Sequence, residues 1–363
     1  MNGARLLVYG AGPLGSLFAA RLQQGGNDVS LLARGQRLAD LQEHGVVLVD
    51  ETTKQQTVTR VTVVEALDPD DAYDLVLVIM RKNHALRILP VLAANQHTPN
   101  VLFLMNNAAG PAELVEAIGT ERVLMGFPRA AGYRDGHVIH CVAGTAEEPR
   151  EVPFGEPDGR ITQRTHQVAQ ILESGVGFEA DIRTDMDGWL KTHAALLFPS
   201  VAPALYAAGS DNYRLARTRD AVLLATRGIS EGFRVLQALG VPITPKGFQR
   251  LAWLPEQVLV PFLQRAFARE SMETALAKHA NAARDEMKHL ADEFLSLASG
   301  TSVPTAAIDQ LYPYFDPDTP LMPDGSAEIP MRWGGLVVLS GAVIAGMAAL
   351  ALLLNRLNSR RKR

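Results

Sequence analysis

Residues 5–20 read RLLVYGAGPLGSLFAA, and this stretch decides the fold of the 363-residue chain. The short apolar run Arg5–Tyr9 has the length and composition of a buried parallel strand. It leads into a glycine-rich turn, G-x-G-x-x-G, and then into apolar residues at helical spacing. This order is typical of a dinucleotide-binding unit, in which the start of the helix binds the pyrophosphate. The candidate cofactor contacts in the turn are Gly10, Ala11, Gly12, Pro13, Leu14 and Gly15.

Each of the three glycines in this turn has a physical role. The first allows the tight turn, the second lets a pyrophosphate approach the backbone, and the third lets the helix pack closely on the strand. A structural turn without a ligand is the alternative, because the glycine pattern is weak on its own. Its position directly after the first strand of the chain favours the nucleotide site.

The residues after the second strand, Val29–Leu32, indicate which dinucleotide is bound. NAD sites place an acidic residue there for the ribose 2′-hydroxyl, whereas an arginine accommodates a 2′-phosphate. Here Arg34 follows the strand, with Arg37 nearby, and no acidic residue follows until Asp40. The sequence therefore predicts NADP(H), with a solvated surface arginine as the alternative.

Further strands are expected in the N-terminal half. Val46–Val49 and Val58–Val64 alternate like a small antiparallel unit, and Asp-Gly predicts a hairpin turn within 133–139. Leu75–Met80 and Val101–Met105 are typical of buried parallel strands. Because ligands of open α/β sheets bind beyond the carboxyl ends of the strands, polar residues there are candidate ligand contacts. These candidates are Arg81, Lys82, Asn83, Asn106 and Asn107.

From about residue 181 the pattern becomes helical. The expected helical segments are Trp189–Ala208, Asp220–Leu239, Val258–Glu293 and Thr305–Leu311, with breaks at Pro199 and at Gly-Pro stretches. The predicted fold class is α/β, a Rossmann-type domain followed by an all-α domain, with the active cleft between them. We divide the chain into an NADP-binding domain (1–181), a helical substrate domain (182–315), a linker (316–331), a transmembrane helix (332–355) and a basic tail (356–363).

The predicted transmembrane helix is based on Trp333–Leu354, 22 consecutive residues without a charge. As a helix they span about 33 Å at about 1.5 Å per residue, enough to cross a hydrocarbon core of roughly 30 Å. A buried core helix is the alternative, but it would keep a polar stripe, and this segment has only Ser340. We therefore expect residues 333–354 to contact the lipid bilayer. The spacing of Gly341 and Ala345 would permit a homodimer but is too common to decide it.

Composition and charge exclude several functions. Apolar residues (47%) and charged residues (20%) are close to the average of folded proteins, which excludes a disordered or fibrous chain. The last eight residues hold five basic and no acidic side chains, so residues 1–355 carry a net charge of −9, against −4 for the whole chain. An acidic body argues against nucleic-acid binding. The nine histidines include no H-E-x-x-H, so no metal site is expected.

Two features of the sequence indicate the cellular compartment of the part that precedes the predicted transmembrane helix. The single cysteine, Cys141, excludes a disulfide framework and fits a reducing compartment. Residues 5–20 are better explained by a strand and turn than by a secretory signal. We therefore expect a cytoplasmic catalytic body anchored by the C-terminal helix, although the basic tail favours the opposite orientation.

With these features the chain resembles the ketopantoate reductase (2-dehydropantoate 2-reductase) family from residue 5 to about residue 312. The pieces that carry the resemblance occur in order: GAGPLGSLFAARL with Arg34, the Arg81 region, Asn106 in LMNNAAGPAEL, Asp135-Gly136, Ile182-Arg183 before Trp189-Leu190-Lys191, and Asp285-Glu286-Met287 before Val303-Pro304. The resemblance implies NADPH-dependent reduction of a 2-oxo acid to a 2-hydroxy acid, the reaction that serves pantothenate biosynthesis in this family.

The resemblance also implies roles for individual residues. It maps the catalytic lysine onto Lys191, the substrate-binding glutamate onto Glu286, and the asparagine between cofactor and substrate onto Asn106. Arg81 stands where the family has a cofactor-binding lysine, and Thr274 replaces a serine. Hydride arriving at a ketone leaves negative charge on oxygen, so Lys191 would act as general acid while Glu286 positions the substrate.

Other positions bear on the substrate. The candidate partners of a substrate carboxylate are Thr274, Lys278 and Arg81. The family's two asparagines, four and eight residues after the catalytic lysine, are here Ala195 and Pro199. Loss of such amide partners costs a factor of about 10⁴ in discrimination at a site built around hydrogen bonds. The expected substrate is therefore ketopantoate or a related 2-oxo acid.

Other hypotheses stay open at this point. One is a membrane-tethered NADP(H)-binding sensor or scaffold without turnover, and another is a reductase of a bulkier or more apolar oxo substrate. Structural readings of the two main residues also remain. A lysine in an alanine-rich helix is commonly solvated, and the RDEMKH stretch around Glu286 could be an exposed face.

Overall fold

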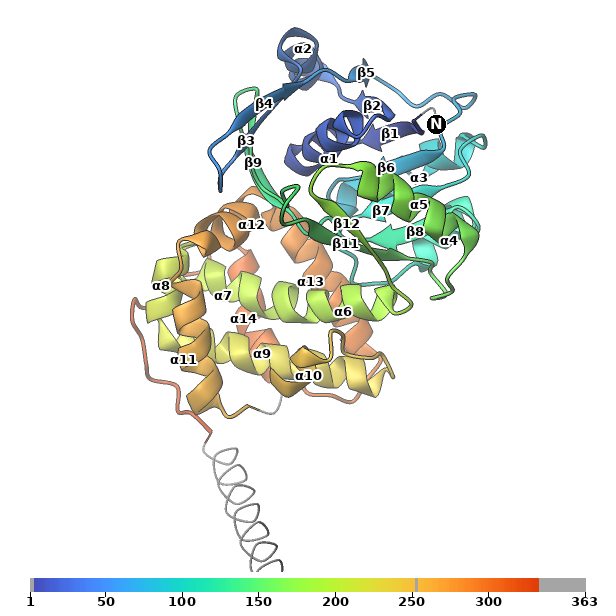
Figure 1. Cartoon of the computed structure of the whole chain (residues 1–363). Coiled ribbons are helices and arrows are strands. Elements are labelled where there is room, and N and C mark those ends of the chain that lie inside the picture. Colours follow the sequence, from blue (N-terminus) through green and yellow to red (C-terminus); the bar gives the residue numbers. More distant parts are fainter. Residues whose placement is uncertain (1–2, 252–253, 333–363) are drawn as a thin grey trace, which may run out of the picture.

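The computed structural model describes residues 3–251 and 254–332. An α/β part and a helical part lie against each other, at the top and bottom of Figure 1. This arrangement confirms the predicted combination of a Rossmann-like α/β unit and a helical C-terminal region.

An eight-stranded sheet forms the centre of the α/β part. Its strands lie in the order β12-β11-β8-β7-β6-β1-β2-β5, and all neighbours are parallel except β11 and β8. The strands are β1 (Arg5–Tyr9), β2 (Asp28–Leu32), β5 (Thr62–Val64), β6 (Leu75–Val78), β7 (Val101–Leu104), β8 (Val123–Gly126), β11 (Arg150–Gly155) and β12 (Phe178–Ile182).

The central strands are apolar throughout because helices cover both faces of the sheet. Along β1, Leu6 and Val8 point to the core that includes Phe18 of α1 (Pro13–Gln24). The alternate residues Leu7 and Tyr9 point to the opposite core, beneath α3. The remaining helices of this part are α2 (Gly35–His44), α3 (Lys82–Ala94), α4 (Ala112–Ile118) and α5 (Gln163–Ser174).

A second, four-stranded sheet has the order β4-β3-β10-β9. It consists of β3 (Val46–Asp50), β4 (Gln56–Thr59), β9 (Ala131–Asp135) and β10 (Val138–Val142). The predicted hairpin is confirmed, since Asp135 pairs with Val138 across a turn in which Gly136 has a φ of +57°. The prediction that 58–64 belongs wholly to the small antiparallel unit is wrong. Thr62–Val64 instead pairs with the open edge of β2 and extends the main sheet in parallel.

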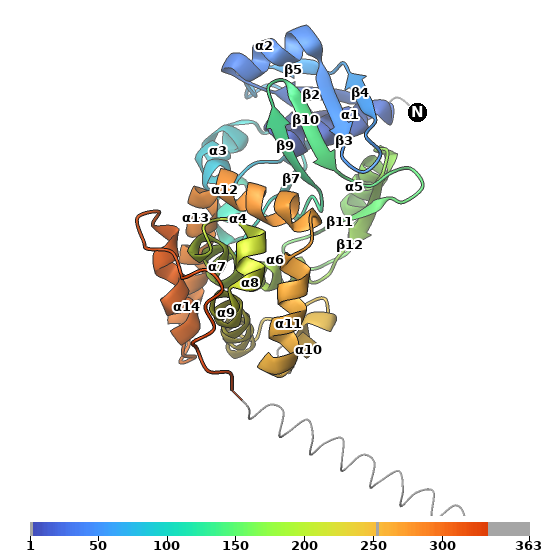
Figure 2. The same ribbon diagram turned by 90° about the vertical axis from the view of Figure 1, so that its left-hand side faces the viewer.

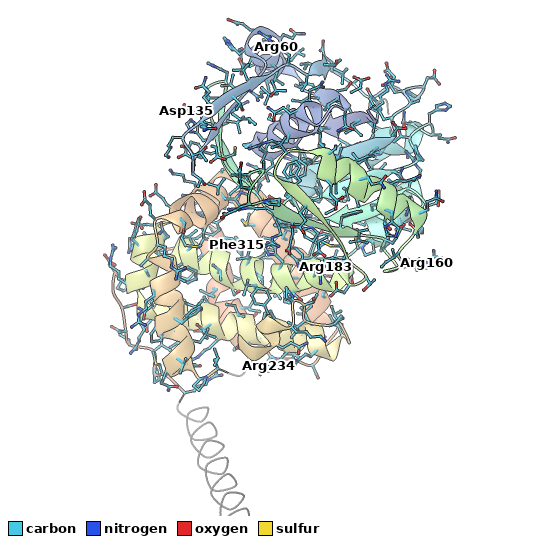
Figure 3. The ribbon with its side chains drawn as sticks, in the orientation of Figure 1. Arg60, Asp135, Arg160, Arg183, Arg234 and Phe315 are labelled. Carbon is cyan, nitrogen blue, oxygen red and sulfur yellow. The ribbon has the colours of Figure 1, made fainter. Side chains whose placement is uncertain are left out.

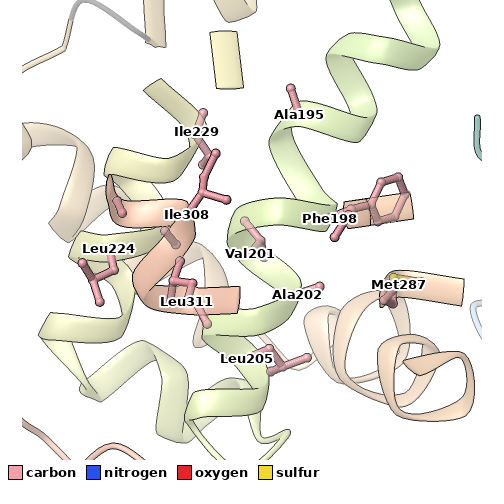
Figure 4. Close-up of a cluster of buried hydrophobic side chains, with 14 of the residues drawn as sticks. Ala195, Phe198, Val201, Ala202, Leu205, Leu224, Ile229, Met287, Ile308 and Leu311 are labelled. Atoms are coloured by element: carbon pink, nitrogen blue, oxygen red, sulfur yellow. The ribbon is translucent and has the colours of Figure 1, made fainter. Parts of the chain in front are cut away.

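The helical part is built around α9, which runs through its centre (Figure 1). In chain order, the elements of this part are α6 (Met186–Leu196), η1 (Leu197–Val201), α7 (Ala202–Ala207), α8 (Asn212–Arg217), α9 (Arg219–Ala238), α10 (Gly247–Leu251), α11 (Glu256–Phe267), η2 (Glu273–Lys278), α12 (His279–Ala282), α13 (Arg284–Ser299), α14 (Ala306–Leu311) and η3 (Tyr312–Phe315). Figure 4 shows how Ile308 and Leu311 of α14 meet Leu224 and Ile229 of α9 in the buried core.

Two predicted helix boundaries need correction. The sequence predicts a helix break at Pro199, but a π-helical turn there joins α6 to α7. Proline removes one backbone donor at this point without ending the helix. The segment 258–293 was expected as one helix, and this is wrong. The described chain divides it into α11, η2, α12 and α13, and Ala283, with φ of −134° and ψ of 33°, separates the last two.

Arg183, labelled in Figure 3, makes one of the contacts between the two parts. Arg183 follows β12 and donates to Asp181 and Asp185 at 3.0 and 2.9 Å. It also donates to Oγ1 of Thr244 in the helical part at 3.2 Å.

Residues 316–332 form a strap without a helix or strand that lies against the helical part. The buried carboxylate of Asp220 accepts the backbone N–H groups of Glu328 and Ile329 at 2.8 and 3.1 Å. Arg217 donates twice to Asp324, at 2.7 and 2.9 Å. Within the described ranges, no helix is long and apolar enough to cross a membrane. The predicted transmembrane segment 333–354 and the basic tail 356–363 lie outside these ranges.

We expect Asp220→Ala to release the strap. Two partly buried N–H groups would lose a charged acceptor, which lowers the free energy of unfolding by about 2 kcal/mol. Urea denaturation and limited proteolysis within 316–332 measure the two effects. Asp324→Asn is the matched control, because its ion pair is exposed and contributes little. Equal effects of the two substitutions would contradict this account.

Candidate active site

The glycine turn between β1 and α1 has the shape of a phosphate cradle. Gly10 has a φ of +122°, and a Cβ there would lie 2.5 Å from the carbonyl oxygen of Ile79. A Cβ on Gly15 would lie 1.8 Å from the carbonyl oxygen of Gly10, so the third glycine lets helix and strand pack. A Cβ on Gly12 would meet nothing within 4 Å. Pro13 and Leu14 open α1 at this cradle. The open space over Gly12 at a helix start fits a pyrophosphate.

The two arginines predicted near the cofactor differ in role. Arg34 is exposed at the start of α2, beyond the carboxyl end of β2, and its Nε donates to the carbonyl oxygen of Glu65 at 3.0 Å. Arg37, which the sequence places near Arg34, does not lie beside it as a second exposed cation. Arg37 is buried and donates to the carbonyl oxygen of Ala11 (3.2 Å) and to Oγ of Ser16 (3.0 Å). Arg37 therefore braces the glycine turn from inside.

A buried carboxylate faces the carboxyl ends of β6 and β7. Glu286, in the first turn of α13, accepts the backbone N–H of Lys82 at 3.2 Å and hydrogen bonds to the side chain of Asn106. Burial raises the pKa of Glu286 to about 6, and the Lys82 N–H, the charge of Arg81 and the Asn106 amide only partly oppose this effect. Oδ1 of Asn106 is buried and has no hydrogen-bond partner among the described residues. An unpaired buried acceptor at a strand end fits a ligand N–H or O–H.

Arg81 and Asn83, which follow β6, connect the α/β part to the first turn of α13. Arg81 donates to Oδ1 of Asp285 at 2.9 Å and to the carbonyl oxygen of Ala282. Asn83 donates to Oδ2 of the same aspartate at 2.9 Å. The Arg81 side chain therefore joins the end of β6 to the start of α13, in contact with the helical part rather than the glycine turn.

The most buried charge of the interface is Lys82, which the sequence analysis names as a candidate ligand contact and which the structure places in an ion pair. Its side chain is 1% exposed, and Nζ lies 2.6 Å from Oε1 of Glu293 on α13 and 2.8 Å from Oδ1 of Asn107. Oε2 of Glu293 also accepts the backbone N–H groups of Ala108 and Ala109, each at 3.3 Å. This network holds the loop after β7 to the helical part.

Lys191 lies on the other side of that loop. Its Nζ lies 2.6 Å from Oδ2 of Asp187, one turn earlier on α6. A Cβ on Gly110 would lie 3.2 Å from the same Nζ, and Gly110 exchanges hydrogen bonds of 2.9 and 2.8 Å with the Asn107 side chain. The fold thus brings Lys191 to the loop that carries Asn106, while no hydrogen bond joins Lys191 to Glu286 in the described chain.

Not every predicted position reaches this interface. Lys278 pairs with Glu273 at 3.2 Å and lies 5.1 Å from the ring centre of Tyr133, beside the small sheet. The Thr274 side chain lies outside what the structure describes. Ala195 and Pro199 are buried in the helical core.

The buried state of Ala195 changes the argument about the substrate. A Cβ on Gly232 of α9 would lie 3.2 Å from the Ala195 Cβ, so this position serves helix packing. In the described structure Ala195 and Pro199 are both packing positions of the helical part, and neither offers an amide to a ligand. The partly exposed side chains of this region are aromatic: Phe127, directly after β8, packs on Trp189 and His193 at ring-centre distances of 5.1 and 4.6 Å. Burial and then the nearby His279 lower the pKa of His193 to about 4, so its ring is neutral.

A glycine turn after β1, polar side chains at the strand ends and helices packed against them define the class, a Rossmann-like α/β protein with a helical C-terminal region. Residues 6–155 match the family model described as "Ketopantoate reductase PanE/ApbA". The 2-dehydropantoate 2-reductase of Mesorhizobium japonicum is 26% identical over 275 residues, covering 67% of this chain and 81% of that protein.

Solved structures agree on the fold. A PanE/ApbA family ketopantoate reductase from Ralstonia eutropha has a TM-score of 0.66 at 19% identity, covering 85% of this chain and 96% of that one. D-mandelate dehydrogenase with NADH and anilino(oxo)acetate has a TM-score of 0.65 at 16% identity, with the same coverage. The comparisons support the predicted ketopantoate reductase family and an NADP-dependent oxidoreductase that acts on CH–OH groups.

We expect Lys82→Met to destabilise the protein strongly, because it leaves Glu293 buried without its cation. The free energy of unfolding should fall by about 3–5 kcal/mol in urea denaturation. Adding Glu293→Gln to Lys82→Met should restore part of the loss. Lys288→Met is the matched control on the same helix, where the ion pair with Asp292 is half exposed. A loss no larger than that of the control would contradict the assigned role.

The raised pKa of Glu286 predicts a pH-dependent stability. Between its ordinary value of 4.5 and about 6, the folded state binds more protons than the unfolded chain, so the free energy of unfolding falls as pH rises. The contribution of protonated Glu286 to the free energy of unfolding is fully present below pH 4.5 and is lost as the pH rises past 6. The Glu286→Gln variant cannot ionise at this position. The difference between its free energy of unfolding and that of the native protein should therefore grow in favour of the variant by about 2 kcal/mol from pH 4 to pH 8. A difference that stays constant with pH would refute this.

Proposed function

We propose that the protein is an NADPH-dependent reductase of a 2-oxo acid, ketopantoate or a related compound. The observation that carries the proposal is the pairing of buried Glu286 with Asn106, whose free oxygen lies at the carboxyl end of β7. The glycine cradle would hold the pyrophosphate and Arg34 the 2′-phosphate. Residues 1–181 would then be the cofactor domain and residues 182–315 the substrate domain.

A bound nicotinamide would supply the hydride that reduces the carbonyl carbon. Asn106 would orient the ligand through its unpaired oxygen, and Glu286 would accept a hydrogen bond from the substrate or its new hydroxyl. Lys191 would donate the proton to the carbonyl oxygen, with Asp187 holding the ammonium group in place. The neutral amine would then regain a proton from solvent. Arg81, beyond the end of β6, would be the partner of the substrate carboxylate.

The same proposal includes a membrane anchor. Residues 333–354 have the length and composition of a transmembrane helix, and Arg332 precedes them. The strap would connect this anchor to a cytoplasmic catalytic body. A membrane-tethered NADP(H) sensor remains the second candidate, because Ala195 and Pro199 replace the amides that the related family carries.

We expect Lys191→Ala to separate enzyme from sensor. NADPH oxidation, followed by absorbance with ketopantoate and a panel of other 2-oxo acids, should fall at least about 10²-fold because the proton donor is removed. NADPH binding, followed by its fluorescence, should stay unchanged. Lys288→Ala is the control, and NADH should support slower turnover than NADPH. Tight NADPH binding without Lys191-dependent turnover of any 2-oxo acid would favour the sensor.

A further inference from the structure

One face of α11 exposes apolar side chains to solvent. Val258 and Phe262 lie one turn apart in the helix, Leu254 lies two residues before its first residue, and all three are exposed. These three residues form an exposed apolar stripe at the start of α11. The opposite face of α11 buries Leu259, Val260 and Phe267. Single exposed apolar residues are ordinary, but an aligned stripe beside a fixed structural feature indicates an interaction surface.

The stripe lies beside Arg332, the last residue that the structure describes. The backbone N–H of Arg332 donates to Glu256 at 2.8 Å, and Gln257 donates to the carbonyl oxygen of Arg332 at 3.0 Å. Glu256 is itself held by Arg227 through two hydrogen bonds of 2.8 and 3.0 Å. Arg332 is therefore clamped to the first turn of α11, and Figures 1 and 2 both show the strap leaving the body there.

Basic side chains border the stripe. Arg265 lies one turn after Phe262 on the same face, and it makes no ion pair among the residues that the structure describes. It lines a hollow of about 400 Å³ between α8 and α11, together with Arg217 and Tyr213. Apolar residues flanked by arginine are the pattern of a helix that lies at a membrane surface, where the cation reaches the headgroups.

We propose that the stripe Leu254–Val258–Phe262 is a membrane-contact face that rests on the headgroup region of a bilayer, with Arg265 facing anionic lipid. This inference depends on the proposed anchor. Because Arg332 is clamped beside α11, a bilayer entered by the next 22 uncharged residues must lie close to this helix. The contact would restrict how the catalytic cleft is oriented relative to the membrane.

The test uses the full chain in vesicles of phosphatidylcholine and phosphatidylglycerol in equal parts. Phe262→Cys is labelled with an environment-sensitive fluorophore, since the one native cysteine, Cys141, is buried. Lipids carrying spin labels at shallow or deep positions then quench the label. We expect strong shallow quenching, consistent with a depth of about 5–10 Å. Val58→Cys is the matched control in the α/β part, with 56% exposure against 57% for Phe262.

Flotation of the same vesicles separates the two proposals. Co-flotation with quenching at position 262 but not at position 58 supports the membrane-contact face. Co-flotation without quenching at 262 overturns that face while the anchor stands. If the protein does not float with the vesicles, both the proposed membrane anchor and the proposed membrane-contact face are refuted. Val258→Cys, one turn away, repeats the measurement should the first label perturb the helix.

Discussion

The interface between the α/β part and the helical part is built around one buried ion pair, Lys82 with Glu293. Lys82 begins α3 at the carboxyl end of β6, and Glu293 projects from the middle of α13, so the pair joins the two parts of the molecule. Charges with so little access to water are tolerated only when each is paired and hydrogen bonded. Asn107 and the backbone of the following loop supply those bonds. The same groups thereby set the position of the loop beside Lys191.

The proposed catalytic groups come from three separate segments of the chain. Asn106 follows β7, Lys191 lies on α6 and Glu286 starts α13, and only the packing of the helical part on the sheet edge gathers them. Burial raises the pKa of Glu286 to about 6, which suits a group that exchanges a proton or a hydrogen bond with a ligand hydroxyl. The aromatic side chains Phe127 and Trp189 would give the neighbouring wall an apolar character.

The C-terminal strap has a comparable structural role at the far end of the molecule. Its backbone N–H groups are paired with Asp220, and Arg332 is paired with Glu256. These bonds hold a segment with four prolines and one glycine, and with no helix or strand of its own, in one path along the helical part. A membrane helix attached there would leave the protein beside α11, so the exposed stripe of that helix would face the bilayer.

Local sequence determined the βα turn, the strand faces and the 133–139 hairpin. Glycine φ values, two-residue alternation and turn chemistry act between neighbours. Tertiary structure alone decided that Lys82 pairs with a residue 211 positions away, that Arg37 braces the glycine turn, and that Ala195 packs on Gly232. It also divided 258–293 into several helices. Burial, partners and charge compensation depend on contacts between distant segments, and no local pattern encodes them.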